Sequence, residues 1–422
     1  MPIGCPRNNE PLPAVVAMKV GAGRLLFIAE QAIFALGGLA LMSVLAHHVS
    51  MAQFGQYATG QGLVVGLTFL IGALVTYPLL FTAASRHRAH GIIPGLVFAR
   101  SGASVAGVAG ALLMAVLLWP ADPWLAMGMG LWLLGWAAYE LTRRLAFLAG
   151  RSGLLLVCSA GIFTAPVLLV LSGLLPAEHC LPLALGLTGA LFAAMHVATW
   201  RAISTAPWFT MPWWPWWSGR RARWHARHAR DLVAPKLLQL APLILIPWLL
   251  AHAASPAEAA RWQAALMLAS LPMPVVYVLG TAMVRDLALP GGARPMTVAI
   301  RYAALGIVPF VLIMPFSGAL AALLLGSRYA TQQDTAALSL AAGLAAAMVH
   351  LQMCFLLGVR RPGAAWQVSL VGCVLLAILA VAALATGWRL DYQAALWCWI
   401  AASAATLLAG LTAHQVSRRS CL

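Results

Sequence analysis

Residues 207–236 read PWFTMPWWPWWSGRRARWHARHARDLVAPK, and this stretch separates two long apolar halves of the chain. It gathers six tryptophans and five arginines: Trp208, Trp213, Trp214, Trp216, Trp217, Trp224, Arg220, Arg221, Arg223, Arg227 and Arg230. Tryptophan prefers the headgroup layer of a bilayer, and arginine clusters mark the cytoplasmic side of membrane spans. Such clusters also attract anionic lipid. We expect residues 207–231 to form a cytoplasmic interfacial loop, or a hinge between the two halves.

The composition on either side of this loop excludes a soluble protein. Hydrophobic residues make up 62% of the chain and charged residues 9%, against about 45–50% and about 25% in soluble domains. The formal charge of +16 therefore belongs to loops at a membrane surface. No nucleic-acid partner is expected, because the usual basic stripe with interleaved polar residues is missing.

The sequence offers no metal site, cofactor site or catalytic motif. Its seven cysteines show no paired spacing, which argues against a disulfide framework or a zinc site. Neither H-E-x-x-H nor G-x-x-x-x-G-K-[ST] occurs, and the first 24 residues lack the pattern of a cleaved signal peptide. We expect a protein that is not an enzyme and binds no cofactor.

The apolar stretches predict an all-α integral membrane protein. A helix needs about 20 apolar residues to cross the hydrocarbon, and the sequence predicts twelve spans: 25–46, 60–83, 95–118, 124–146, 153–175, 180–200, 232–251, 262–284, 298–325, 335–358, 364–386 and 393–415. Six spans precede the central loop and six follow it. We therefore expect a six-span lobe at 1–206, the loop at 207–231 and a second six-span lobe at 232–422.

The basic residues of the loops set the orientation, because Lys and Arg are retained on the cytoplasmic side. With both termini cytoplasmic, all but three of the 26 basic residues face the inner side, the exceptions being Arg261, Arg328 and Arg389. One missed span would invert every later loop and destroy this asymmetry. We expect a bacterial inner-membrane location.

The two halves also resemble each other in sequence. LAHHVSMA at 45–52 matches LAHAASPA at 250–257, and FLAGR at 147–151 resembles FLLGVR at 355–360. Each pair occupies equivalent positions in the predicted topology. Because six is an even number, the halves share one orientation and are expected to be related by a pseudo-two-fold axis along the membrane normal.

The first half contains several short polar and aromatic motifs: Glu30-Gln31-Ala32, Ser50, Phe54-Gly55, Tyr57, Tyr77-Pro78, Tyr139-Glu140-Leu141-Thr142-Arg143-Arg144, Phe147, Gly150 and Arg151. These motifs resemble polysaccharide flippases of the multidrug/oligosaccharidyl-lipid/polysaccharide exporter (MOP) superfamily. The resemblance implies translocation of a lipid-linked oligosaccharide, a short glycan on a polyprenyl pyrophosphate, by alternating access for polysaccharide export. Membrane lipids are expected partners, and a polysaccharide polymerase is a candidate partner.

Two other classes stay open. A multidrug or other small-molecule exporter of the same superfamily would share the topology, although few carboxylates lie within the spans to receive cationic cargo. A membrane glycan polymerase or ligase has a similar number of spans, but it generally requires a sizeable outer loop. Every outer loop predicted here is at most about a dozen residues.

Charged residues inside apolar spans are the candidates for a functional site. Glu30 is either a proton or cation site that lines a cavity, or a carboxylate that pairs with a neighbouring helix or reaches the surface. Glu140 stands three and four residues before Arg143 and Arg144, so the three can share one helix face. They form either an ion cluster, with Glu140 as a second coupling-ion candidate, or an arginine contact for substrate phosphate.

Arg100 and Arg301 occupy similar places near the cytoplasmic ends of the third span of each half. Snorkelling to the inner surface explains either arginine by itself. Their matching placement also suits a two-sided clamp on a diphosphate, which makes both of them candidate substrate-binding residues.

Overall fold

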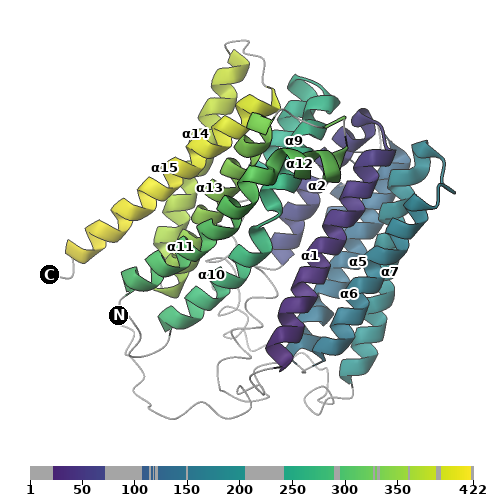
Figure 1. The fold of residues 1–422 in the computed structure, drawn as a ribbon, viewed down its shortest axis with the longest axis horizontal. Helices are drawn as coiled ribbons and strands as arrows, with labels where there is room; N and C mark the ends of the chain where they lie inside the picture. The colour runs from purple at the N-terminus through teal and green to yellow at the C-terminus, as the bar shows by residue number, and fades with distance from the viewer. Residues whose placement is uncertain are drawn as a thin grey trace.

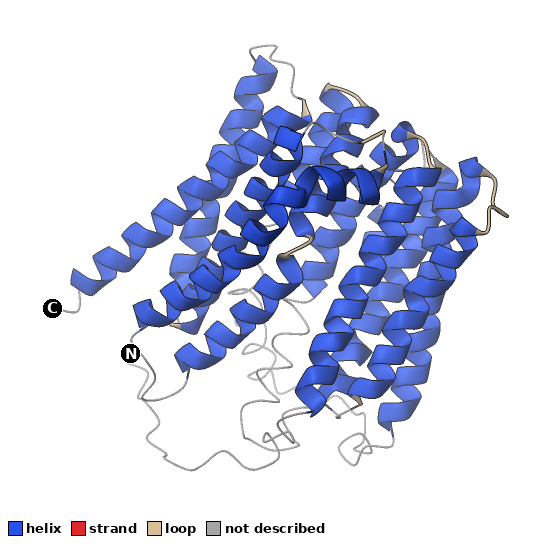
Figure 2. Ribbon diagram, in the orientation of Figure 1, coloured by secondary structure: helices blue, strands red, loops and turns tan. Residues whose placement is uncertain are grey.

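The computed structural model of the chain describes residues 22–71, 107–113, 116, 118, 122–148, 151–204, 242–288, 295–326, 328–329, 333–359, 362–385 and 391–419. All regular secondary structure within these ranges is helical (Figure 2). The central loop 207–231 and most of the predicted third span lie outside the described residues.

The first half of the chain forms a group of long helices: α1 (Ala22–His48), α2 (Met51–Ile71), α5 (Pro123–Leu148), α6 (Ser152–Leu171) and α7 (Ala177–Ser204). Helix α5 packs along α7, and α1 packs along α6. The α5–α7 contact is close because Gly135 faces Gly189, and a Cβ at either position would collide with the opposite backbone. Small residues of this kind let helices approach in a lipid environment, where packing drives association.

The second half forms another helical group: the helix Pro242–Ala253, α9 (Pro256–Ser270), α10 (Met273–Ala288), α11 (Pro295–Ile313), η3 (Met314–Phe316), α12 (Ser317–Leu325), α13 (Gln333–Gly358), α14 (Pro362–Ala385) and α15 (Tyr392–Arg419). Figure 1 shows α10, α11, α13, α14 and α15 on one side of the molecule and α1, α5, α6 and α7 on the other.

Two predicted spans of the second half contain a change of helix, although residues 295–325 still form one candidate span. The span predicted at 262–284 is divided between α9 and α10, which bend by 53° across Leu271 and Pro272. The span predicted at 298–325 changes from α11 to α12 at the short helix η3, which contains Pro315. Proline removes a backbone donor and clashes with the preceding turn, which is why helices kink there.

The apolar helices confirm a multi-pass membrane fold. In the described residues seven helices are long and apolar enough to cross a membrane, or eight if the bent α9–α10 pair counts as one span. They include 29–48, 152–171 and 177–203 in the first half and 334–358, 363–382 and 392–412 in the second. The predicted lobe boundaries at 206/207 and 231/232 fall outside the described ranges and stay predictions.

The matching motifs of the two halves begin equivalent helices. Ser50 precedes α2, where its Oγ accepts from Gln53 N at 3.2 Å and Gln53 Oε1 accepts from Ser50 N at 3.2 Å. Ser255 precedes α9, where its Oγ accepts from Glu258 N at 3.3 Å. At α2 the two bonds form a capping box, which satisfies free donors of the first helical turn. At α9 the serine caps the helix in the same way, but Ser255 N donates to Leu250 O and the Glu258 carboxylate accepts from Tyr392 N instead. A serine N-cap therefore starts the second helix of each half.

The two helical groups meet at the end of α1 that carries His47. Ser43 Oγ donates to Leu324 O at 2.6 Å, and an Arg328 nitrogen donates to Val49 O at 3.3 Å. Helices α2 and α9 touch so closely that a Cβ on Gly55 would collide with the carbonyl of Pro256. Toward the other end of α1, α1 and α10 diverge (Figure 1). The halves are therefore joined at this end of the molecule, and α2 continues the contact toward Gly62, where a Cβ would collide with Leu243 O of the helix Pro242–Ala253.

Candidate functional site

A charged cluster lies inside the first half, and its central residue is Glu30 of α1. The residue is only 1% exposed, although it lies at the start of an apolar helix. An intramembrane carboxylate is costly and normally pairs within the bundle. Glu30 meets this requirement through side chains of its own helix and of α5 and α6.

Arg143 of α5 makes the main contact with Glu30. Its Nε lies 2.7 Å from Glu30 Oε1, and its Nη2 lies 3.1 Å from Glu30 Oε2. The remaining Nη1 donates to Glu140 Oε2 at 2.9 Å. One guanidinium therefore binds two carboxylates at once, which its planar fork of donors makes possible.

Two neutral side chains complete the hydrogen bonding of Glu30. Ser159 of α6 donates to Oε1 at 2.8 Å, and Gln31 donates to Oε2 at 2.7 Å. The carboxylate thus accepts four hydrogen bonds from charged and neutral donors, the arrangement that an ionised carboxylate requires. The guanidinium carbon of Arg143 also lies 4.4 Å from the ring centroid of Phe34, in cation–π contact.

The cluster holds three helices together in an apolar environment. Glu30, Glu140 and Arg143 are each at most 5% exposed, and they lie beside the rings of Phe34 and Tyr139. Removal of one partner from a buried ion pair typically costs about 3–5 kcal/mol, because the other charge is left unpaired.

The structure brings together three of the six predicted site residues. The predicted contact between Glu140 and Arg143 is present, and Glu30 pairs with a neighbouring helix, which was one of its two predicted environments. Arg144 belongs to α5, but its side chain lies outside the described residues, as does all of Arg100. Arg301 lies on α11 with an exposed side chain. The clamp of Arg100 and Arg301 stays a prediction.

Sequence reasoning missed two members of the cluster, Gln31 and Ser159. Gln31 adjoins Glu30 in the chain, and two polar residues together at the start of an apolar span are a usable signal. Ser159 gives no comparable signal, because a serine in an apolar helix can satisfy its hydroxyl on its own backbone. Its role becomes visible only once α6 is packed against α1.

The second half contains a smaller, partly buried polar contact. Tyr302 of α11 donates to Asp286 Oδ2 of α10 at 2.6 Å. This contact fixes the two helices to each other near their connection. Within the described residues no group of three or more His, Cys, Asp or Glu side chains could hold a metal ion.

No protein-family model matches the chain, and no curated protein matches its sequence significantly. Its fold, however, matches solved transporters over nearly their whole length. A Vibrio cholerae MATE transporter, VcmN in its bent form, is 15% identical with a TM-score of 0.55, covering 93% of this chain and 97% of that one. A multidrug resistance MATE family transporter of the MOP superfamily, solved in an outward-facing conformation, is 9% identical with a TM-score of 0.58, covering 98% and 99%.

A third solved structure has the same fold and is distinguished by its binding pocket. This MOP superfamily transporter from Pyrococcus furiosus is 11% identical with a TM-score of 0.59, covering 96% of this chain and 95% of that one. It is described as having a binding pocket of reverse polarity, which suggests a different function for that protein. At these identities the likeness concerns the fold: the chain has the fold of MATE transporters.

Proposed function

We propose that the protein moves a lipid-linked oligosaccharide, a glycan on a polyprenyl pyrophosphate, across the inner membrane by alternating access. Both termini and residues 207–231 would lie in the cytoplasm. A pyrophosphate that carries sugars cannot cross hydrocarbon unaided, because burial of its charge without partners is very costly. The fold supports a carrier, since the solved structures that share it are transporters. A carrier of two helical halves can bind its cargo where the halves meet.

The contact of Arg143 with both Glu30 and Glu140 is the observation that carries the choice of cargo. A cationic drug needs a carboxylate that can face it, but in this cluster each carboxylate already binds a guanidinium. An anionic headgroup needs a cation, and Arg143 would supply one within the spans once a proton on Glu30 releases its Nε and Nη2. Arg301, which is exposed, and Arg100, for which a substrate-binding role is predicted from the sequence, would add further cations.

The pocket polarity of transporters with this fold is compatible with a cargo other than a cationic drug. In the Pyrococcus furiosus transporter, a reversed pocket polarity is linked to a different function. The same fold therefore accommodates pockets of either polarity. A multidrug exporter is the second candidate here, favoured by the fold likeness to a multidrug resistance MATE transporter.

Glu30 would act as the coupling-ion site in this proposal, with Glu140 as its neighbour. A proton on Glu30 removes the charge that holds Arg143 Nε and Nη2, and the guanidinium is then available to another anion. Arg143 would thereby bind Glu30 when the coupling ion is absent and the anionic cargo when the coupling ion is bound. Such differential binding to two states is what any coupling mechanism requires.

The test is transport by the purified full-length chain in liposomes. Two cargoes are compared: a polyprenyl pyrophosphate that carries a fluorescent oligosaccharide, and the cationic dye ethidium. The proposal expects translocation of the glycolipid and none of ethidium. Translocation of ethidium alone would establish the exporter and overturn the proposal.

Matched variants connect the result to the cluster. Arg143→Gln should reduce glycolipid transport strongly, while Arg151→Gln should leave it unchanged. Arg151 provides a suitable control because its side chain is exposed at the start of α6. Equal transport by both variants would remove Arg143 from the mechanism.

A further inference from the structure

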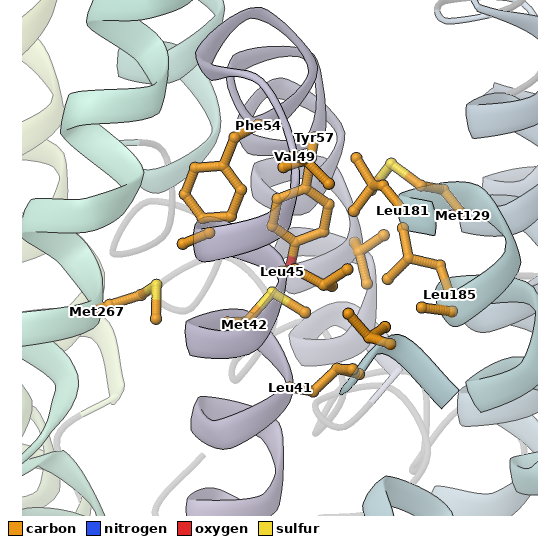
Figure 3. Packing of buried hydrophobic residues seen from close by; sticks show 14 of the residues in the cluster. Leu41, Met42, Leu45, Val49, Phe54, Tyr57, Met129, Leu181, Leu185 and Met267 are labelled. Carbon is orange, nitrogen blue, oxygen red and sulfur yellow. The ribbon is translucent and has the colours of Figure 1, made fainter. Parts of the chain in front are cut away.

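A continuous row of aromatic rings runs from the first half of the molecule to the second. Trp132 of α5 stacks on Tyr57 of α2 with 6.4 Å between ring centroids, and Tyr57 stacks on Phe54 at 5.7 Å. Phe54 contacts Tyr329 at 5.5 Å, in the turn between α12 and α13. Figure 3 shows Phe54 and Tyr57 side by side near Leu45 of α1. We call these four aromatic residues the aromatic row.

The polar atoms of the aromatic row have no hydrogen-bond partner among the described residues. They are the hydroxyls of Tyr57 and Tyr329 and Nε1 of Trp132, and Gln61 Oε1 one turn after Tyr57 is likewise unpartnered. Tyr57 is fully buried and Tyr329 is 2% exposed. Each unpaired buried group costs about 1–3 kcal/mol. Phenylalanine at positions 57 and 329 would fill the same space without an unpaired hydroxyl, as Phe54 does between them in the row.

The aromatic row ends where the two halves are joined. The neighbour of Tyr329 in the chain, Arg328, donates a hydrogen bond from its guanidinium to Val49 O of the first half. Shortly before Tyr329 in the chain, Leu324 O accepts a hydrogen bond from the Ser43 hydroxyl. These contacts are inter-half contacts, so separation of the halves at this end withdraws Tyr329 from Phe54. The faces of both rings are then uncovered, with Tyr57 next in the row. A carrier that alternates between two states must separate its halves at each end in turn.

We propose that the aromatic row binds the sugar part of the lipid-linked cargo when the two halves separate at this end. The inference deepens the proposed function and rests on it. A sugar ring offers an apolar C–H face and several hydroxyls. The row offers ring faces together with unpaired donors and acceptors. In ligand sites, aromatic side chains provide the contact surface and a few polar groups fix the orientation of the ligand. The pyrophosphate is assigned to the arginines, and the uncharged glycan to the row.

The hydroxyl of Tyr329 is suited to this role. Burial raises the pKa of Tyr329 to about 12, and the positive charge of Arg328 opposes part of that increase. The phenol therefore stays protonated at neutral pH, where it both donates and accepts. A neutral donor and acceptor matches a sugar hydroxyl better than it matches a phosphate.

The experiment removes the polar atoms and keeps the rings. Tyr57→Phe, Tyr329→Phe and the double variant are reconstituted in liposomes, and transport of glycan-bearing polyprenyl pyrophosphate is compared with transport of the bare polyprenyl pyrophosphate. Each lost hydrogen bond should reduce transport of the glycan-bearing lipid about tenfold. Transport of the bare lipid should not change. Trp132→Phe should behave like the tyrosine variants, and Trp124→Phe, exposed on the same helix, should behave like wild type.

The outcomes separate this inference from the proposed function. A loss confined to the glycan-bearing lipid supports the row as a sugar site. Unchanged transport of both lipids, or equal loss of both, overturns it. If the wild type moves neither lipid, the proposed function fails, and binding of the free oligosaccharide to purified protein decides instead. Equal affinity of the wild type and the double variant would then overturn the inference.

Discussion

Arg143 Nε and Glu30 Oε1 lie 2.7 Å apart, although 113 residues separate them in the chain. The pair connects α5 to α1, and the same guanidinium reaches Glu140 one turn earlier on its own helix. One side chain therefore determines both the packing of the first half and the charge of its interior. The consequences for stability and for transport can be tested separately.

Arg143→Lys should lower the thermal stability of the protein, although it keeps the charge. A lysine ammonium is a point charge and cannot present three donors to two carboxylates in the geometry of the fork. Arg143→Ala should be worse, by about 3–5 kcal/mol relative to wild type, because it leaves buried carboxylates unpaired. A thiol-reactive dye can follow unfolding, since Cys158 and Cys180 are buried. Arg151→Lys is the control, and equal midpoints for all variants would contradict the role of the cluster.

Glu30→Gln should abolish coupled transport while the protein still reaches the membrane at normal abundance, because Glu140 remains to pair with Arg143. The amide keeps the size of the carboxylate but cannot carry the charge or accept donors on both atoms. Transport driven by an imposed pH gradient is the measurement, with membrane abundance determined in parallel. Full complementation of a deletion by this variant would show that Glu30 is not a coupling site.

Arg100 and Arg301 should act together on an anionic headgroup. Arg→Lys at either position should impair transport of the lipid pyrophosphate, because two guanidinium forks make paired hydrogen bonds that lysine cannot make. Insertion should be unaffected, and the double Arg→Ala variant should be worse than either single one. Transport rates in liposomes give the answer. Normal transport by both lysine variants would leave snorkelling as the explanation of these residues.

Residues 207–231 should face the cytoplasm and the turn at His47–Tyr57 the outside. Single cysteines at Ser218 and Gln53 of a cysteine-free variant can be treated with an impermeant thiol reagent in intact cells. Position 53 should be labelled, and position 218 only after the cells are opened. The reverse pattern would overturn the orientation inferred from the basic residues.

Gly55→Ala should separate the two halves at the end where they are joined. The added Cβ collides with the carbonyl of Pro256, which is rigid backbone. Spin labels are attached to cysteines that replace His48 and Ala254, and the distance between them is measured by pulsed electron paramagnetic resonance. This distance should become longer. Gly363→Ala is the matched control, because a Cβ there meets nothing within 4 Å. An unchanged distance in the Gly55 variant would mean that the halves tolerate the contact by a local shift.

The sequence predicts the fold well because the bilayer imposes its own length on each helix. Long apolar stretches became helices, and the equivalent serines Ser50 and Ser255 both became helix caps. The bend between α9 and α10 at Pro272 was not predicted, whereas the span predicted at 298–325 is retained as one candidate span despite Pro315. Proline inside a span is compatible with either a kink or a complete interruption. The packing of neighbouring helices decides between them.

The site was predictable only where its geometry is local. Glu140 and Arg143 are three residues apart on one helix, so their contact follows from helical spacing. The contact between Glu30 and Arg143 depends on how α1 and α5 are rotated toward each other, which a single sequence does not encode in any short pattern. Ser159 could not be distinguished from an ordinary serine of an apolar helix for the same reason.

The contact between α2 and α9 brings together two copies of one element. These helices hold the same place in their respective halves, so the element packs against its own counterpart. An isologous two-fold dimer is joined in the same way, through one patch that meets its own copy. Here both patches belong to one chain and need not be identical. At the offset of the sequence repeat Gly55 has Ala260 as its counterpart, so only one of the two positions lacks a side chain.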